Sequence, residues 1–235
     1  MLVEEIMSRP VLAVESEYSV LEALNVARFR RIRHLPVVES LGVANGAREH
    51  DFRTLPPAPE GARLVGIVSD RDLRDACPSV LSAGATDFAA LARASVADIM
   101  HGDVVTVHPH DSVEEAARLL YQHHISCLPV VSGQGLVGIV TETDVLRAIV
   151  TLLGVTSPGS HLEVEVPDRP GHLGEVTRLI GQHQVNIASV LIVPGRREHT
   201  RVLVLRVQTI DPRRLVRSLE EAGYHVLWPS GLKLA

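Results

Sequence analysis

Cysteine is scarce in this chain, and long apolar runs are missing from it. The 235 residues include two cysteines, Cys77 and Cys127, which lie far apart and form no C-x-x-C pattern. A disulfide framework or a zinc site built from thiolates is therefore not expected. The longest apolar stretch, AIVTLLGV, is too short to cross a bilayer.

Neither a leader segment nor an excess of charge of one sign is visible. The first ten residues, MLVEEIMSRP, contain two acids and no long apolar core, so we expect no secretory signal. A formal net charge of −5 gives no electrostatic reason to expect nucleic acid or an anionic membrane surface as a partner. We therefore expect a cytoplasmic protein.

Recognisable catalytic motifs are absent as well. The sequence contains no G-x-S-x-G, P-loop, H-E-x-x-H or dinucleotide-binding glycine pattern. Histidines gather at His108-Pro109-His110 and at His123-His124, but neither group has an evident third ligand. We read them as turn and helix-end residues, and we expect neither a metal site nor an enzyme.

An internal repeat is the strongest feature that is present. Residues 3–38 match residues 96–131 at a constant offset of 93, whereas GIVSDRD at Gly66 and GIVTETD at Gly138 are offset by 72. The difference of 21 residues places extra material in the first copy, within the turn-rich stretch 39–63, which predicts an extended loop. The matched segments are IM at Ile6 and Ile99, V-x-x-V at Val11 and Val104, and LPVV at Leu35 and Leu128.

Each copy predicts the order β-α-β-β-α. A short β segment, VLAV or VVTV, precedes a helix that opens with S-x-x-E at Ser19 or Ser112, the pattern of a capping box. Two apolar strands, LPVV and LVGIV, and a second helix follow. Two such halves are expected to face each other around a pseudo-twofold axis.

The second helix of each copy begins with a hydroxyl and, three residues later, a carboxylate: Ser69 with Asp72, and Thr141 with Asp144. One interpretation is a further capping box. The other is a nucleotide site, because amides at a helix start suit phosphate and a carboxylate accepts hydrogen bonds from ribose hydroxyls. The two interpretations are compatible.

These segments together resemble a pair of CBS motifs, a Bateman module, over about residues 1–153. The resemblance implies that an adenine nucleotide (AMP, ADP or ATP) binds between the motifs, with S-adenosylmethionine or NAD as alternatives. It also implies a purine lying against the first β segments and the strands that contain Pro-Val-Val. The residues that it assigns to nucleotide binding are Ser69, Asp72, Thr141, Asp144, Ala13, Thr106, His34, Pro36, Pro129 and Arg31.

The two copies are not expected to bind equivalently. Arg30 and Arg31 correspond to His123 and His124 in the second copy, so phosphate charge is available on one side only. Thr106 corresponds to Ala13, which removes one polar contact. The arginines also fit a solvated helix face, and some CBS pairs bind nothing and only assemble oligomers.

The last third follows a linker near TSPGS and predicts the order β-α-β-β-α-β of a ferredoxin-like domain. Its DRPG segment, with Leu173, Val176 and a later Val-Asn-Ile, resembles an ACT domain. The resemblance implies a small carboxylated ligand such as an amino acid; the alternative is that DRPG is only a turn that starts a helix. The ligand candidates are Asp168, Gly171, His172, Leu173 and Asn186.

We therefore predict a mixed α/β (α+β) protein with four segments. These are a first CBS motif at 1–78 with its insertion at 39–63, a second at 79–153, a linker at 154–160 and an ACT domain at 161–235. The domain order is similar to that of AcuB-type proteins, named for acetoin utilisation. The function it implies is non-catalytic sensing of a nucleotide, and of an amino acid or other small metabolite, transmitted by rearrangement of a homodimer. The alternatives are a structural oligomerisation module with degenerate pockets and a regulatory subunit of a separate enzyme chain.

Overall fold

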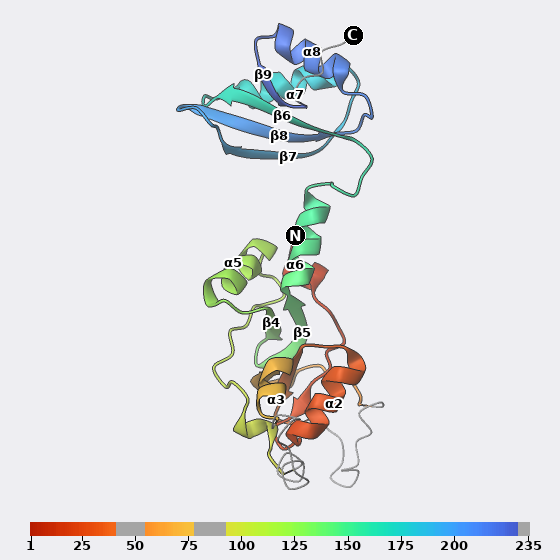
Figure 1. The fold of residues 1–235 in the computed structure, drawn as a ribbon, viewed down its shortest axis with the longest axis vertical. Coiled ribbons are helices and arrows are strands. Elements are labelled where there is room, and N and C mark those ends of the chain that lie inside the picture. Colours follow the sequence, from red (N-terminus) through yellow and green to blue (C-terminus); the bar gives the residue numbers. More distant parts are fainter. Residues whose placement is uncertain (41–54, 78–92, 230–235) are drawn as a thin grey trace. The chain divides into compact units, whose positions relative to one another are not determined.

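The computed structural model describes residues 1–40, 55–77 and 93–229. The chain divides into two compact units, Met1–Val145 and Leu146–Ala235, and each contains its own buried apolar cluster (Figure 1). The division falls within helix α6, ahead of the linker expected at 154–160. Residues 41–54 of the predicted insertion and residues 79–92 of the predicted second motif lie outside the described residues.

The first unit is built on a five-stranded sheet in the order β1-β2-β3-β5-β4. Strands β3 and β5 are the sheet's link between the two sequence copies, because β3 pairs with β5 through Ala62 and Arg63. The elements of this unit are α1 (Val3–Ile6), β1 (Val14–Glu15), α2 (Val20–Arg30), β2 (His34–Val38), β3 (Ala62–Ser69), α3 (Asp70–Asp75), η1 (Val96–Asp98), α5 (Val113–His123), β4 (Cys127–Ser132), β5 (Gly135–Thr141) and α6 (Glu142–Leu152).

The repeat is reproduced in the strand register. In the first copy His34 lies opposite Ser69 and Val37 opposite Gly66; in the second copy the equivalent residues Cys127 and Val130 lie opposite Thr141 and Gly138. The register shift after Val37 recurs after Val130. A one-residue slip would turn the side chains of β5 and of the end of β3, whose burial alternates, to the wrong face, so both copies keep the same pairing.

The first helical turn of each copy crosses to the other copy. Residues 1–8 pair with the second copy through bridges from Leu2 to Ser112 and from Ser8 to Ile139. Residues 95–101 pair with the first copy through the equivalent bridges, from Ser95 to Ser19 and from His101 to Ile67. The two copies are therefore interlocked, and each cleft between them receives side chains from both.

A methionine–glycine contact explains why the repeat keeps both residues. A Cβ atom on Gly66 would stand 2.7 Å from the sulfur of Met100, and one on Gly138 would stand 2.4 Å from the sulfur of Met7. Each crossing segment thus lays its methionine on the glycine of the other copy's GIV strand. A larger residue at either glycine would force the methionine side chain of the crossing segment to move.

The helix starts follow the predicted hydroxyl–carboxylate pattern, with one exception. Ser19 and Glu22 form a reciprocal capping box, as do Ser69 with Asp72. Ser112 accepts the backbone N–H of Glu115 at 3.1 Å, but the Glu115 carboxylate pairs with Arg118 instead of reaching back. That helix is capped by the hydroxyl alone, because a guanidinium one turn later competes for the carboxylate.

The first β segments are shorter than expected. The strand expected at 11–14 is confined to Val14–Glu15, and the one expected at 104–107 is reduced to a single bridge between Val107 and Val130. The carbonyl of Val11 instead accepts the N–H of Ala58, from the end of the insertion. The described part of that insertion, up to Gly61, contains neither helix nor strand.

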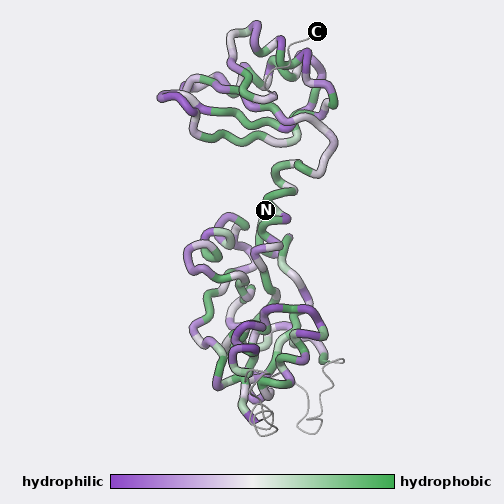
Figure 2. Tube along the Cα trace, viewed as in Figure 1, coloured by the Kyte–Doolittle hydropathy of each residue, from purple (hydrophilic) through white to green (hydrophobic). Residues whose placement is uncertain are grey.

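The second unit has the predicted order β-α-β-β-α-β. Its four-stranded sheet has the order β7-β8-β6-β9, and all three pairings are antiparallel. Apolar side chains of β6 and β8 pack against both helices in one buried cluster, and the apolar strands are visible as green tube in Figure 2. The elements are β6 (Ser160–Pro167), α7 (His172–Gln182), β7 (Ile187–Pro194), β8 (Thr200–Val207), α8 (Arg213–Glu221) and β9 (His225–Trp228).

Helix α8 begins one residue later than the sequence suggests. Pro212 is the N-cap residue instead of the first helical residue, while the Asp211 carboxylate accepts the N–H of Arg213 at 3.1 Å. Asp211 thus supplies the predicted cap from one position further out. Gly223 follows the helix with φ of 87°, a conformation that glycine adopts without strain.

Candidate functional site

The larger of two equivalent clefts in the first unit contains Ser69 and Asp72, and we call it cleft 1. It has a volume of about 430 Å³ and combines the end of β3 with residues 101–105 and 124–127 of the other copy. A volume in this range suits a small-molecule ligand. The crossing segment and strand β4 supply its opposite wall, with Val104, Val105, Ile125 and Cys127.

Asp72 uses its two carboxylate oxygens differently. Oδ2 accepts both the N–H of Ser69 at 2.8 Å and its hydroxyl at 2.6 Å, which completes the cap. Oδ1 lies 3.6 Å from Nε2 of His101 and belongs to a partly exposed side chain. Partial burial raises the pKa of Asp72, but the hydrogen bonds from Ser69 and the proximity of His101 outweigh burial and hold this pKa below its usual value. The carboxylate is therefore ionised at neutral pH and ready to accept hydrogen bonds.

The wall opposite Asp72 is largely apolar, with Asp103 as a charged residue in it. Burial raises the pKa of the Cys127 thiol to about 12, so this side chain remains a neutral thiol that acts as a small apolar group. His34, which occupies the equivalent position in the first copy, has its pKa lowered chiefly by burial and is neutral at pH 7. An apolar wall facing a carboxylate matches a ring system attached to a polyhydroxylated group.

Cleft 2 is the pseudo-twofold equivalent of cleft 1. It encloses about 300 Å³ and is lined by Thr141 from β5, with Arg31, Arg33 and Ser126. Two arginines here replace His124 and Ser126 of cleft 1. His34 and Ser126 line both clefts and are joined by a 2.8 Å hydrogen bond between Nε2 and Oγ. This pair forms the partition between the clefts.

The carboxylate beside cleft 2 is less accessible. Asp144 is 8% exposed, and its Oδ2 accepts the N–H of Thr141 at 3.0 Å and the hydroxyl at 2.7 Å. The cap geometry therefore matches that of Ser69 and Asp72, but the carboxylate is buried. Cleft 2 has two arginines, Arg31 and Arg33, and a smaller volume, whereas cleft 1 has one arginine, Arg71, with an accessible carboxylate and more space.

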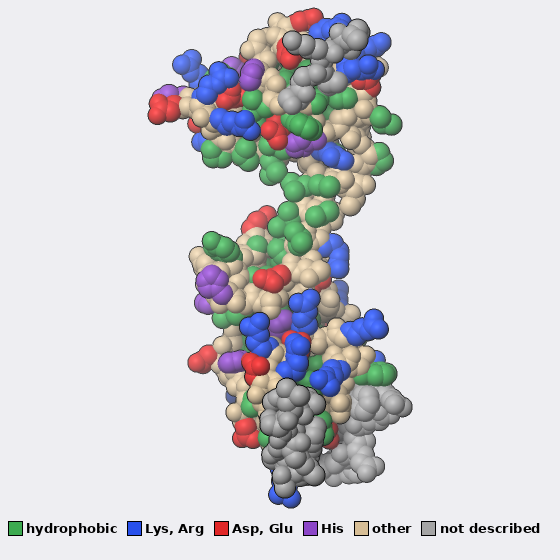
Figure 3. All heavy atoms as spheres, viewed as in Figure 1, with side chains coloured by type: hydrophobic (Ala, Val, Ile, Leu, Met, Phe, Trp, Pro, Cys, Tyr) green, Lys and Arg blue, Asp and Glu red, His purple; other side chains and the backbone are tan. Residues whose placement is uncertain are grey.

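The arginine cluster forms a basic surface beside cleft 2. Arg28, Arg31, Arg33 and Arg74 line a depression of about 310 Å³ next to α2 and α3. Figure 3 shows Lys and Arg side chains gathered on this face of the unit. Arg31 lines both the depression and cleft 2, which makes the basic surface continuous with the cleft.

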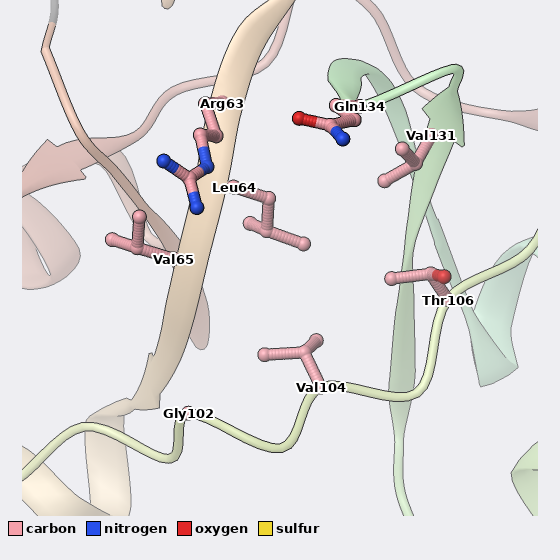
Figure 4. A pocket seen from close by; sticks show the side chains of 8 residues that line it. All are labelled: Arg63, Leu64, Val65, Gly102, Val104, Thr106, Val131 and Gln134. Atoms are coloured by element: carbon pink, nitrogen blue, oxygen red, sulfur yellow. The ribbon is translucent and has the colours of Figure 1, made fainter.

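Four of the remaining predicted residues do not line either cleft. Ala13, Pro36 and Pro129 are buried in strands or beside them. Thr106 is exposed and lines a separate groove between β3 and β4 (Figure 4). Gly102 and Thr106 line that groove, whereas His101, Asp103 and Val105 line cleft 1, and Val104 lines both.

Sequence reasoning missed several residues of these clefts, among them the charged Arg71 and Asp103 and two that make polar contacts. His101 follows the Ile-Met motif directly and faces Asp72, and Ser126 hydrogen-bonds His34 across the pseudo-twofold axis. The signal for His101 was its equivalence with Ser8, which lines cleft 2 at the same place. Nothing in the sequence indicated that these segments cross between copies. Among the described residues, no group of three or more His, Cys, Asp or Glu is placed to hold a metal ion.

In the second unit, His172 lies in a cavity of about 350 Å³ at the ends of α7, α8 and β6. Its Nδ1 is 3.2 Å from the hydroxyl of Tyr224, which donates to Glu175. Burial, followed by the Glu175 carboxylate, raises the pKa of Tyr224 to about 12. Glu165, 6% exposed, lines the same cavity and pairs with Arg197 at 2.8 Å. The cavity is therefore polar and rich in titratable groups.

The other predicted residues of this unit are dispersed. Gly171 is the N-cap of α7 with φ of 103°, Leu173 is 39% exposed, and Asp168 pairs with Arg201 at 3.0 Å. Because β6 and β7 flank β8 in the same direction, Asn186 lies at the opposite end of the sheet from Asp168. The separation is about 20 Å along the strands, so one copy of the chain does not bring the two together.

Comparisons with known proteins agree with this architecture. The CBS domain family model matches residues 3–46 and 96–151, and the ACT domain family model matches residues 160–223. An inosine-5'-monophosphate dehydrogenase of Nitrosopumilus maritimus is 31% identical over 134 residues, which are 57% of this chain and 21% of that protein. The chain spans less than two thirds of the length of the curated relatives that it matches first.

Solved structures are similar to the first part of the chain. A putative acetoin utilization protein (AcuB) from Vibrio cholerae is 29% identical, with a TM-score of 0.47, covering 66% of this chain and 95% of that one. CBSX2 in complex with AMP is 27% identical, with a TM-score of 0.47, covering 64% and 96%. No helix in the described ranges is both long and apolar enough to span a bilayer.

Proposed function

We propose that this chain, which the CBS domain family model matches over residues 3–46 and 96–151 and the ACT domain family model over residues 160–223, is a non-catalytic regulator that binds an adenine nucleotide in cleft 1. The observation that carries the proposal is the pairing of an ionised, partly exposed carboxylate with an apolar wall inside one 430 Å³ cleft. Asp72 would accept hydrogen bonds from the ribose hydroxyls. Val104, Val105 and neutral Cys127 would contact the purine.

Cleft 2 supports a second, weaker nucleotide position with a different preference. Arg31 and Arg33 favour a longer phosphate chain, because each additional phosphate adds negative charge beside two guanidinium groups. Its volume of about 300 Å³ and the buried Asp144 make it less suited to the nucleoside part. We therefore expect AMP to occupy cleft 1 first and ATP to favour cleft 2 more than AMP does.

Calorimetric titration of the full chain with AMP, ADP, ATP, S-adenosylmethionine and NAD tests the proposal. The decisive comparison is AMP against 2',3'-dideoxy-AMP, because only the ribose hydroxyls differ. Loss of two hydrogen bonds to a carboxylate is expected to weaken binding by at least about tenfold. Equal affinity for the two would remove Asp72 from the site, and binding of no nucleotide would leave a structural oligomerisation module as the function.

At the ACT domain we propose an amino acid or a similar small carboxylated metabolite as ligand. The cavity beside His172 supports this because it presents Glu165, Glu175 and Tyr224 to an ammonium group and Arg197 to a carboxylate. The test is a thermal-shift screen of the full chain with the common amino acids. A true ligand at about one hundred times its Kd should add about 2.7 kcal/mol of stability.

The proposed output is a rearrangement of a homodimer that acts on a partner enzyme in the cytoplasm. Exposed apolar side chains on α6, among them Leu146, Ile149 and Leu152, provide a surface for self-association. Coupling between nucleotide and metabolite sites is typically worth about 1–3 kcal/mol. Light scattering with and without nucleotide, and co-purification from a host that grows on acetoin, would test the dimer, the partner and the AcuB-like role.

A further inference from the structure

A groove between β3 and β4 adjoins cleft 1, with which it shares Val104. It encloses about 290 Å³. In Figure 4 the side chains of Leu64, Val104, Thr106 and Val131 point toward one another across this space, and Gln134 reaches over it from the β4–β5 turn. The volume is at the lower limit for ligand pockets, about 300–1,000 Å³, which favours a few anchoring side chains over a whole nucleotide.

The pseudo-twofold axis relates this groove to a place that the chain itself fills. The equivalents of Val104, Thr106, Val131 and Leu64 are Val11, Ala13, Val38 and Leu136. All four equivalents are 6% exposed or less and belong to the main apolar cluster. In the open groove, by contrast, none of the four residues is fully buried.

The filling comes from the end of the first-copy insertion, the sequence LPPAP at 55–59. Leu55 is 3% exposed and belongs to the same buried cluster, and Ala58 packs against that cluster. The N–H of Ala58 donates to the carbonyl of Val11 at 2.8 Å. This segment is therefore held by the buried side chain of Leu55 and by the hydrogen bond from Ala58 to Val11.

The open groove keeps the means to hold a similar segment. Its wall residues are the same or similar: Val104 for Val11, Val131 for Val38 and Leu64 for Leu136. No backbone N–H of the described residues donates to the carbonyl of Val104, which is equivalent to the carbonyl of Val11. The rim is more polar, with Thr106, Gln134 and Arg63, whose side chain is 63% exposed and lies 3.5 Å from the carboxylate of the equally exposed Glu39.

We propose that this groove binds an extended leucine–proline segment, flanked by an acidic residue, from a partner protein. The segment would place its leucine between Leu64 and Val131 and donate one N–H to the carbonyl of Val104. Prolines restrict the free peptide to extended conformations, which lowers the entropy lost on binding. The acidic residue of the partner would share the guanidinium of Arg63 with Glu39 or replace Glu39 there, because that ion pair is exposed at the rim and therefore weak.

The chain supplies its own probe for the experiment. An end-blocked peptide LPPAPE, the sequence of residues 55–60, is titrated into ¹⁵N-labelled full-length protein, and amide shifts are followed by NMR. Saturable shifts are expected at Thr106, Val131 and Gln134, with no saturable shifts for the peptide SPPAPE. Gln134→Trp fills the groove from an exposed turn and should weaken binding by at least about tenfold. Gln182→Trp, an exposed glutamine of the other unit, is the matched control and should leave binding unchanged.

Four results would overturn the proposal. The first is the absence of saturable shifts with LPPAPE, and the second is binding that Gln134→Trp leaves intact. The third is a set of shifts at Val11 and Ala13 instead, which would mean that the peptide displaces the internal segment. A decrease in molecular mass of the Gln134→Trp protein in light scattering would show that the groove holds a second copy of the chain, and would equally contradict a partner protein. Nucleotide affinity of both variants, measured in parallel, separates this groove from cleft 1.

Discussion

The two halves of the unit Met1–Val145 have the same backbone and different surroundings. Their strands pair in the same register, their crossing segments make equivalent bridges, and a methionine covers the same glycine in each. Cleft 1 nevertheless has an accessible carboxylate, Asp72, and one arginine, Arg71, whereas cleft 2 has two arginines and the equivalent carboxylate beside it, Asp144, is buried.

The difference shows what a duplicated fold conserves. Residues that make local hydrogen bonds or backbone contacts, such as Ser69 with Asp72 and Met100 on Gly66, recur in both copies. Residues that face the clefts are free to diverge, since changing them costs little stability. A duplicated module therefore offers two sites with related shapes and distinct chemistry.

The largest expected effect concerns the filled and the open grooves. Leu136→Ala should lower the free energy of unfolding by about 2–5 kcal/mol, because Leu136 is buried in the groove that holds Leu55. Leu64→Ala, its equivalent beside the open groove, should cost clearly less. Urea denaturation of both full-length variants measures the difference, and equal losses would contradict the inequality of the two grooves.

The next comparison is between the two carboxylates. Asp72→Asn should weaken AMP binding by about 10- to 150-fold, the equivalent of 1.5–3 kcal/mol for hydrogen bonds to a charged group. Asp144→Asn should leave the tighter AMP site unchanged, because Asp144 is buried beside cleft 2. Calorimetry measures both affinities, and circular dichroism checks that each variant folds. An Asp72→Asn protein with unchanged affinity would refute the ribose contact.

A charge exchange tests the arginine asymmetry more finely. Arg31 and His124 occupy equivalent helix ends, both in the left-handed conformation with φ of 55° and 53°. The double variant Arg31→His, His124→Arg exchanges them without adding backbone strain. The preference for ATP over AMP should move from cleft 2 to cleft 1 by roughly 1 kcal/mol, near fivefold. NMR titration assigns each cleft, and a preference that stays in cleft 2 would show that Arg31 is only a solvated residue.

The smallest effect is the pH dependence of the partition between the clefts. His34 has its pKa lowered chiefly by burial, so the unfolded chain binds the proton more readily than the folded one. The stability that neutral His34 contributes is fully present above the pKa of this residue in the unfolded chain, about 6.5. It is lost as pH falls below that value toward the lower pKa of His34 in the folded protein. His34→Gln keeps a partner for Ser126 and does not titrate.

Thermal unfolding of the wild type and of His34→Gln between pH 7.5 and 5 isolates this contribution, because the other histidines are common to both proteins. As pH falls, the wild type should lose more thermal stability than His34→Gln. Asp72, with its lowered pKa, acts in a separate window, since its stabilisation is lost only as pH falls below about 4. If stability falls equally with pH in both proteins above pH 5, burial does not lower the pKa of His34.

Much of the fold was accessible to sequence reasoning, and the cleft composition was only partly so. The repeat predicted both β-α-β-β-α halves, and the hydroxyl–carboxylate pattern predicted the helix starts at Ser69 and Thr141. The placement of Thr106 and the role of His101 escaped it, because both depend on which way an irregular segment turns its side chains. The sequence also predicted a capping role for the Glu115 carboxylate that the structure does not show, because Arg118 pairs with this carboxylate instead.

The sequence by itself determined the local features. These are the duplicated order of elements, the helix caps between residues three positions apart, and the alternation of buried and exposed side chains that sets strand register. Tertiary structure alone decided that the first segment of each copy crosses to the other, that LPPAP at 55–59 fills one groove, and that Asp72 stays accessible while Asp144 does not. The reason is range. A cap needs atoms within three residues, whereas accessibility depends on side chains packed together from segments about a hundred residues apart, which no short pattern encodes.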